Sequence, residues 1–391
     1  MVQQRQGTGS YKVPKADNNI LLVANYKSDV GYAWWLMENF WAEIAMNFAR
    51  YNQKCILIYP EINAVPEIIK QAPIQLVKHD FADRSPKALI NLIKIIKKHR
   101  IKNIYLTDKA YFDWLYLVFR AVGVDKIINH DHMPGERTQP KIYKKFIKKT
   151  IHSLKLLSCD HYIGVSRFVK DRAVDIACVP VDKCSFVHNG IKLFNNTKSD
   201  YAHEVFGIPK SSRVIVTTGR ATFYKGIDKL IACANILINE KGIDDVWFLH
   251  VGDGPDLETF KKMAVDLGLK ERFIFAGFRQ DIHDILPSCD IGVQVSLGEA
   301  FSLSVIEYLH AGLATLAPNN CGNSEAIKDG VNGLLFSPGN ISEIVGKIQF
   351  LLNNRSDVEK MKEAARTSVL ENFRIQECNR KLMSLLDRQF V

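Results

Sequence analysis

The chain has 391 residues, of which 47% are hydrophobic and 24% charged, and its formal net charge is +10. This length exceeds one ordinary core and suits two domains, and the lack of any run of 18 apolar residues excludes a membrane span. Eight cysteines without a Cys-x-x-Cys pair argue against a disulfide framework and a zinc site, and fit a reducing cytoplasm.

Short apolar runs alternate with helical patterns along the whole chain, which predicts βα units and mostly parallel sheets. The first half contains expected strands at 20–24, 55–59, 74–77, 103–106, 126–129, 161–165 and 185–188. The second half contains expected strands at 214–218, 246–251, 273–276, 291–295, 314–317 and 334–336. The fold class is therefore α/β, with two tandem Rossmann-like, doubly wound domains that face a cleft.

Three segments follow from this division. Residues 1–195 are expected to form an N-terminal domain, and its first 18 residues are polar, unlike a secretory signal. Residues 196–372 are expected to form a C-terminal domain, after a polar linker at 195–200. Residues 373–391 are expected to form a last segment beyond it.

The positive charge is concentrated in the first half. Residues 1–195 carry 30 Lys and Arg against 17 Asp and Glu, whereas residues 196–391 carry 22 against 25. This asymmetry indicates an anionic partner for the first half. Within it, residues 141–155 contain no acid and place Ile142, Phe146 and Ile147 near one helical face. The pattern favours an interfacial helix on anionic lipid, with a solvated basic face as the alternative; no nucleic-acid motif accompanies it.

Several loops at strand ends in the second half have the chemistry of an anion site. Arg220 and Lys225 follow the first strand, and together they could hold a diphosphate. Gly252 and Gly254 form a tight turn after the next strand, where the backbone could approach a ligand closely. Arg279 occupies the equivalent place after the third strand.

Two glutamates, Glu299 and Glu307, lie on either side of an expected helix start after the strand at 291–295. Helix N-termini attract anions, and carboxylates bind sugar hydroxyls strongly. One glutamate could hold a transferred sugar and the other a ribose, which indicates a nucleotide-sugar enzyme. The structural alternative is a capping box formed by Ser304 and Glu307, with Glu299 an ordinary loop acid.

The order of these motifs resembles that of GT-B glycosyltransferases, most closely the retaining enzymes of family 4. The matching stretches are Gly-Arg-x4-Lys-Gly (219–226), Val-Gly-Asp-Gly-Pro (251–255), Glu-x7-Glu (299–307), Ala-Gly-Leu-Ala (311–314) and Gly-x-x-Glu (322–325). The resemblance covers residues 120–352 well and the first 100 only in outline. It departs at Ser302 and Cys321, where family members often have Gly, and at the glycine pair after strand one, of which only Gly31 is present.

The resemblance implies that residues 1–195 bind the acceptor, that residues 196–372 bind the donor, and that residues 373–391 form a helix that returns to the first domain. It also implies a set of site residues. Arg220 and Lys225 would neutralise the leaving diphosphate, Glu299 would hold the donor sugar, and Glu307 the ribose. A histidine after the strand at 126–129 would lie near the sugar; His130 and His132 are rivals, and His130 ranks slightly higher. The remaining expected residues are Gly219, Gly252, Gly254, Phe301, Ser302, Leu303 and Arg279 for the donor, and Gly31 and His132 for the acceptor.

The expected function is that of a retaining, metal-independent hexosyltransferase without a cofactor. It would use a nucleotide sugar, with a UDP-hexose favoured, and a glycan or glycolipid acceptor in lipopolysaccharide or other surface-glycan synthesis. We expect it in the cytoplasm, with a peripheral position on the inner face of the membrane. The alternatives are a nucleotide-sugar epimerase or hydrolase, and a non-catalytic nucleotide-binding protein associated with a membrane.

Overall fold

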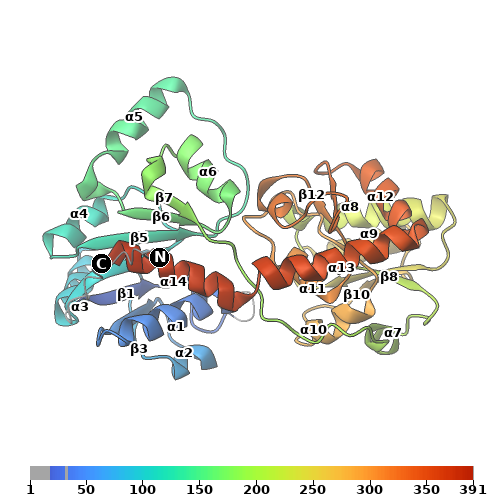
Figure 1. The fold of residues 1–391 in the computed structure, drawn as a ribbon, viewed down its shortest axis with the longest axis horizontal. Coiled ribbons are helices and arrows are strands. Elements are labelled where there is room, and N and C mark those ends of the chain that lie inside the picture. Colours follow the sequence, from blue (N-terminus) through green and yellow to red (C-terminus); the bar gives the residue numbers. More distant parts are fainter. Residues whose placement is uncertain (1–17, 31–33, 391) are drawn as a thin grey trace, which may run out of the picture.

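Two all-parallel sheets form the centres of two α/β domains that lie side by side (Figure 1). The computed structural model describes residues 18–30 and 34–390. The predicted fold class is confirmed, and all thirteen expected strands begin and end within two residues of their predicted bounds. The strand expected at 185–188 ends at Phe186, where the chain leaves the sheet to cross to the second domain.

The N-terminal sheet has the order β3-β2-β1-β4-β5-β6-β7. Its strands are β1 (Asn19–Val23), β2 (Cys55–Tyr59), β3 (Ile74–Lys78), β4 (Ile101–Thr107), β5 (Lys126–Asp131), β6 (His161–Gly164) and β7 (Cys184–Phe186). Its helices are α1 (Trp35–Ala49), α2 (Glu67–Gln71), α3 (Pro86–Lys98), α4 (Trp114–Ala121), α5 (Ile142–His152) and α6 (Arg167–Asp175), with short turns η2 (Lys155–Leu157) and η3 (Val181–Lys183). The strand order reverses between β1 and β4, which opens a crevice at the carboxyl ends of the strands.

The C-terminal sheet has the order β10-β9-β8-β11-β12-β13. Its strands are β8 (Arg213–Thr218), β9 (Val246–Val251), β10 (Phe273–Phe275), β11 (Ile291–Val293), β12 (Ala314–Pro318) and β13 (Leu334–Phe336). Its helices are α7 (Tyr201–Phe206), α8 (Ile227–Asn235), α9 (Leu257–Asp266), α10 (Ile282–Ile285), α11 (Leu303–Ala311), α12 (Ile341–Asn353) and α13 (Arg355–Asn372). The short turns are η4 (Phe223–Lys225), η5 (Ile236–Glu240), η6 (Leu286–Ser288) and η7 (Cys321–Glu325). Here the order reverses between β8 and β11, so the crevices of both domains lie at strand ends.

The chain crosses between the domains twice, and the two crossings pair with each other. The Ile191 N–H donates to the Phe373 carbonyl, and the Ile375 N–H donates to the Ile191 carbonyl. At Gly190, an added Cβ would lie 2.9 Å from the Ile375 Cα, so only glycine fits this crossing. Both connections therefore run through one narrow bridge.

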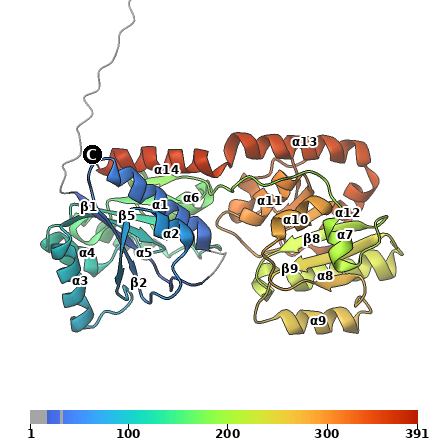
Figure 2. The same ribbon diagram turned by 90° about the horizontal axis from the view of Figure 1, so that it is seen from below.

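The last helix, α14 (Ile375–Phe390), packs on the N-terminal domain. Figure 2 shows α13 and α14 following one another along one side of both domains. The Asn39 side chain of α1 donates to Asn379 at 3.0 Å, and Leu382 and Leu386 enter the same core as Phe40. The N-terminal core thus includes residues from both ends of the chain.

All eight cysteines are buried and free, as predicted. Among the described residues, no helix is long and apolar enough to cross a membrane.

Candidate active site

A cavity of about 780 Å³ lies between the two domains, at the carboxyl ends of their strands. Both domains contribute to its walls. The N-terminal domain supplies Asp29, Val30, Trp34, Leu36, Met37, His132 and Asn189. The C-terminal domain supplies Thr218, Gly219, Arg220, Lys225, Val251, Gly252, Asp253, Phe278, Arg279, Ile282, Glu299, Phe301, Ser302, Leu303, Ser304 and Glu307. Eleven residues predicted from the sequence are therefore brought to the same cavity.

Lys225 and Glu299 form an ion pair in this cavity, with 2.5 Å between Nζ and Oε1. They meet because Tyr224 joins their two loops: its hydroxyl donates to the Gly298 carbonyl, and its own carbonyl accepts from the Leu297 N–H. Lys225 is then followed by Gly226 at φ +73°, a left-handed conformation that disfavours a side chain. The pair is fixed by backbone contacts rather than by the two flexible side chains alone.

Glycines allow the loops after β8 and β9 to pack backbone against backbone. A Cβ added to Gly252 would lie 1.9 Å from the Gly219 carbonyl oxygen, and one added to Gly254 would lie 2.4 Å from that of Ala221. Any side chain at either position would push the two loops apart. This contact holds Arg220 at the edge of the cavity.

The two arginines of the cavity differ in their partners. The Arg220 side chain is exposed, and no carboxylate among the described residues pairs with it. The Arg279 guanidinium instead donates twice to Asp281, which also accepts from the Tyr201 hydroxyl. Arg220 is therefore available to an anion, whereas the charge of Arg279 is already balanced.

Helix α11 points its N-terminus at the cavity, and Ser302 caps it by accepting from the Val305 N–H. The structural alternative of a Ser304–Glu307 capping box is wrong, because the helix begins at Leu303 and Ser304 lies within its first turn. Its first-turn N–H donors are oriented toward the cavity that Phe301, Ser302 and Leu303 line.

Glu307 lies one turn along α11, with its side chain only 8% exposed. One carboxylate oxygen lies 3.5 Å from Nε2 of His283, and the His283 ring stacks on Phe194 at 4.2 Å. The arrangement places a carboxylate at a fixed depth in the wall of the cavity.

The two histidines after β5 are placed differently, and the structure reverses their predicted rank. His130 is completely buried within β5, where its Nδ1 lies 2.5 Å from the Tyr105 hydroxyl. His132 lies just past the strand end and lines the cavity. Both of its ring nitrogens are without a hydrogen-bond partner among the described residues. Burial, and then His130, lower the pKa of His132 well below its usual value, so the ring is neutral at pH 7.

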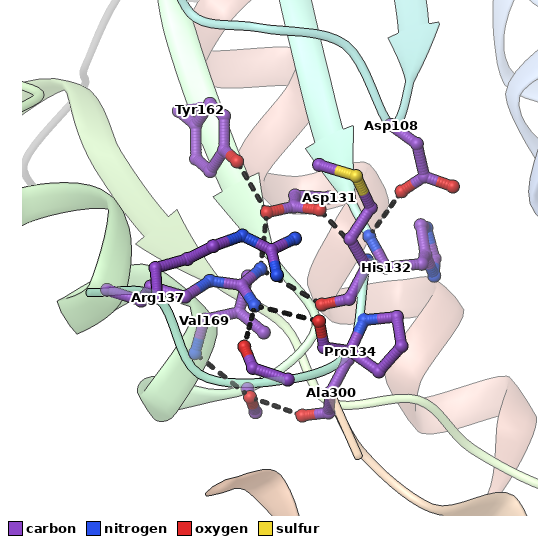
Figure 3. Close-up of polar contacts among 12 residues, drawn as sticks. Asp108, Asp131, His132, Pro134, Arg137, Tyr162, Val169 and Ala300 are labelled. Atoms are coloured by element: carbon purple, nitrogen blue, oxygen red, sulfur yellow. Dashed lines mark hydrogen bonds and ion pairs between the residues drawn. The ribbon is translucent and has the colours of Figure 1, made fainter. Parts of the chain in front are cut away.

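A buried ion pair fixes the chain at His132 (Figure 3). Asp131 accepts from Arg172 at 2.9 Å and from the Tyr162 hydroxyl at 2.5 Å, and both charged side chains are almost fully buried. Arg172 also donates to the carbonyls of Met133 and Gly135. The contacts hold the backbone on both sides of His132.

Asp108 supports the same loop by accepting from the His132 N–H at 2.6 Å. Burial raises the pKa of Asp108 to about 7, despite the opposing effect of this hydrogen bond.

The Gly-x-x-Glu motif serves the domain interface instead of the cavity. Glu325 accepts from the backbone N–H groups of Arg167 and Phe168 at the start of α6, and from His188 at 2.8 Å. Burial would raise the pKa of Glu325, but these hydrogen bonds hold it below its usual value. A carboxylate of the C-terminal domain thus caps a helix of the N-terminal domain.

Two departures from the expected motifs have structural consequences. Cys321 has φ +52°, in the left-handed region where glycine is favoured, so the cysteine is strained there. Ser302 takes the N-cap position of α11 and leaves the charged residues in place. The acceptor-side prediction of Gly31 lies outside the described residues.

Sequence reasoning missed Asn189, whose side-chain oxygen is buried in the cavity wall without a partner among the described residues. It also missed Met37 and Phe278, which line the cavity from α1 and from the loop after β10. Asn189 lies within the motif Val187-His-Asn-Gly-Ile191, so the position of that motif at a strand end was the available signal.

Two Rossmann-like domains with a cavity between them define the GT-B class of fold. Residues 199–368 match the family described as Glycosyl transferases group 1. A glycosyltransferase from Rickettsia africae has a similar structure, with a TM-score of 0.77, 20% identity and coverage of 95% of this chain and 98% of that one. Anabaena HepE in complex with UDP gives a TM-score of 0.72 at 18% identity, with coverage of 95% and 100%. The chain therefore has the fold of GT-B glycosyltransferases, and its C-terminal domain matches the glycosyl transferases group 1 family.

Among curated proteins, the chain is similar to the Escherichia coli UDP-Gal:alpha-D-GlcNAc-diphosphoundecaprenol alpha-1,3-galactosyltransferase. The two are 24% identical over 294 residues, which are 74% of this chain and 76% of the relative. An uncharacterized glycosyltransferase of Methanocaldococcus jannaschii is 25% identical over 58% of this chain, and the match spans 60% of that relative. The chain thus spans less than two thirds of the second relative's length.

Proposed function

We propose that the protein transfers a hexosyl group from a nucleoside diphosphate hexose, with UDP-hexose favoured, to an acceptor hydroxyl with retention of configuration. One observation carries the proposal: the Lys225–Glu299 pair shares one interdomain cavity with Arg220 and His132, whose side chains have no hydrogen-bond partner within residues 18–30 and 34–390. Cations for a diphosphate and hydrogen-bonding groups for hydroxyls are thereby within reach of one ligand.

The donor would replace contacts that the protein now makes with itself. Its diphosphate would bind Arg220, Lys225 and the N–H groups at the start of α11, since both cations and helix N-termini stabilise phosphate oxygens. Glu299, released from Lys225, would then accept hydrogen bonds from the sugar hydroxyls. Glu307, deeper in the wall, would accept from the ribose.

Catalysis would depend on the negative charge that grows on the departing diphosphate. The bond between the anomeric carbon and the phosphate oxygen breaks, the acceptor oxygen bonds to the same face, and its proton passes to that phosphate oxygen. Glu299 would be occupied by the sugar hydroxyls in this complex, which favours same-face attack over a covalent intermediate. Fixed cations stabilise the leaving group without reorganising, so we propose that no metal is needed.

His132 would contribute a hydrogen bond at the sugar or the acceptor hydroxyl. Its ring is neutral, so one nitrogen can donate while the other accepts. Backbone contacts from Asp108 and Arg172 keep it at the cavity wall.

Named relatives support a sugar donor and a surface-glycan product. The Escherichia coli relative uses UDP-Gal and a lipid-linked acceptor, according to its name. The Rhizobium meliloti relative LpsE acts in lipopolysaccharide core biosynthesis, and Anabaena HepE has been solved with UDP-glucose. We therefore propose a glycan or glycolipid acceptor of the cell surface.

The test is to incubate the protein with a panel of nucleotide sugars, with and without lipid-linked sugar acceptors, and to measure nucleotide release and product. Release that requires an acceptor and persists in excess EDTA supports the proposal. An epimerase or hydrolase would turn over without acceptor, and a binding protein would release nothing.

Variants then test the site. Lys225→Met and Glu299→Gln should each lower the transfer rate about 10²–10³-fold, the usual effect of losing one such partner. Lys241→Met, on the surface of the C-terminal domain, is the matched control. Normal rates in folded Lys225→Met and Glu299→Gln proteins would refute the proposed roles.

A further inference from the structure

Helix α5 turns its apolar side chains to solvent instead of to the protein. Ile142 is 88% exposed and Phe146 73%, and Tyr143 and Ile147 are exposed beside them. These four positions, at spacings of one, four and five residues, occupy one sector of the helix. Figure 1 shows α5 at the outer edge of the N-terminal domain.

The inward face of α5 is polar. The Lys148 ammonium donates to the Ile176 carbonyl at 3.1 Å, and the His152 ring contacts the Cys178 carbonyl at 3.2 Å. A helix that rests on its own domain normally buries its apolar face. The orientation of α5 therefore leaves that face for something outside the chain.

The apolar surface continues beyond α5. Leu154, just before η2, and Leu156, within it, are exposed. The η2 turn packs near α4. We define the α5 patch as Ile142, Tyr143, Phe146, Ile147, Leu154 and Leu156. Contiguous exposed apolar side chains of this size are typical of an interaction site.

All the charged side chains of the segment that carries the α5 patch are positive. Residues 137–159 contain six lysines and one arginine but no Asp or Glu. Lys144 and Lys149 are exposed on α5 itself. A protein partner would need a complementary groove, whereas apolar side chains ringed by lysines match the acyl and headgroup layers of an anionic bilayer.

We propose that the α5 patch and its lysines dock the protein on an anionic lipid surface, with Ile142 and Phe146 inserted below the headgroups. The segment that precedes α5 begins at His132 in the active-site cavity, and its residues 134–137 line a second hollow beside Tyr224. Docking would thus hold the mouth of the cavity near the bilayer. The docking surface does not depend on the proposed reaction, because binding is measured without any sugar.

The experiment is flotation of the full chain with vesicles of phosphatidylcholine alone, or with about one third phosphatidylglycerol. We expect binding to the anionic vesicles only, weakened by high salt. The double variant Ile142→Ser/Phe146→Ser should weaken binding about tenfold or more. Lys144→Gln and Lys149→Gln should each weaken it roughly fivefold.

Matched controls remove exposed side chains elsewhere. Val265→Ser/Leu370→Ser and Lys241→Gln/Lys270→Gln lie on the C-terminal domain and should bind vesicles like the unchanged protein. Absence of vesicle binding by the unchanged protein would overturn the proposal. So would full binding by the Ile142→Ser/Phe146→Ser variant, which would indicate attraction by charge alone. If that variant instead changes the oligomeric state and no form binds vesicles, the patch joins copies of the chain, and the proposal fails.

Discussion

Lys225 and Glu299 neutralise each other, whereas His132 faces the same cavity with both ring nitrogens unpaired among the described residues. A ligand that separates the ion pair must supply an anion for the lysine and hydroxyls for the glutamate. A nucleotide sugar supplies both, and it brings further hydroxyls to the histidine.

The two neighbouring histidines should respond oppositely to mutation. His132→Ala should lower the transfer rate about 10²-fold and change the free energy of unfolding little, because this side chain lies in the cavity wall. His130→Ala should instead destabilise the fold by about 2–4 kcal/mol, because it removes a buried ring and its bond to Tyr105. Transfer rates and urea unfolding curves measured on both variants check these expectations. Equal effects of the two substitutions on the transfer rate would contradict the assignment of His132 to the site and of His130 to the core.

Sequence reasoning could not separate these histidines, because both lie at the end of one strand. The decision depends on where β5 stops, and pairing with β4 and β6 extends the strand to Asp131. His130 is thereby kept inside the sheet, and His132 is the first residue past it. That end point is set by contacts with residues far away in the chain.

A second residue-scale prediction concerns pH. Glu38 of α1 is buried, and burial raises its pKa to about 7. In the unfolded chain the Glu38 carboxyl ionises near pH 4. Between about pH 4 and 7 the folded state therefore binds more protons than the unfolded state, and the folded protein loses stability as the pH rises through this range. The change in melting temperature caused by Glu38→Gln should therefore be more favourable at pH 8 than at pH 4. Glu43→Gln, on the same helix, is the control, and a shift independent of pH would contradict the prediction.

At the scale of elements, the loops after β8 and β9 depend on glycine. Gly252→Ala should destabilise the protein by about 2–4 kcal/mol, because the new Cβ would meet the Gly219 carbonyl. Gly242 is a matched control: its φ of +66° is also left-handed, but nothing lies within 4 Å of an added Cβ. Gly242→Ala should cost only about 1–2 kcal/mol. Equal losses of unfolding free energy in urea would show that backbone strain, not the loop contact, requires Gly252.

The positions of the strands and loops could be predicted from the sequence, whereas the contacts between them could not. The strands were recognised because most of them are short apolar runs buried on both faces of a parallel sheet, as in β1 and β8. The glycine turn at 252–254 was also visible, but not its reason, since Gly219 lies in a different loop. Glu325 was recognised only as part of the Gly-x-x-Glu motif, and its contact with the start of α6 in the other domain was not predicted. Such pairings depend on how the domains dock.

For the whole molecule, the site exists only because two domains meet. Ser166 before α6 donates to the Ala300 carbonyl at 2.6 Å, and Val165 and Val169 pack with Phe301 and Val305 in one apolar cluster. This interface lies beside the Glu299 loop. Each domain alone would lack either the side of the cavity with Arg220 and Lys225 or the side with His132.

Isothermal titration with UDP, GDP and ADP tests the central claim most directly. One of these nucleotides should bind the unchanged protein at one site, and Arg220→Gln and Lys225→Met should each weaken its binding about tenfold or more, because each removes a cation from the diphosphate. Unaltered affinity in both folded variants, or binding of none of the three by the unchanged protein, would contradict the account.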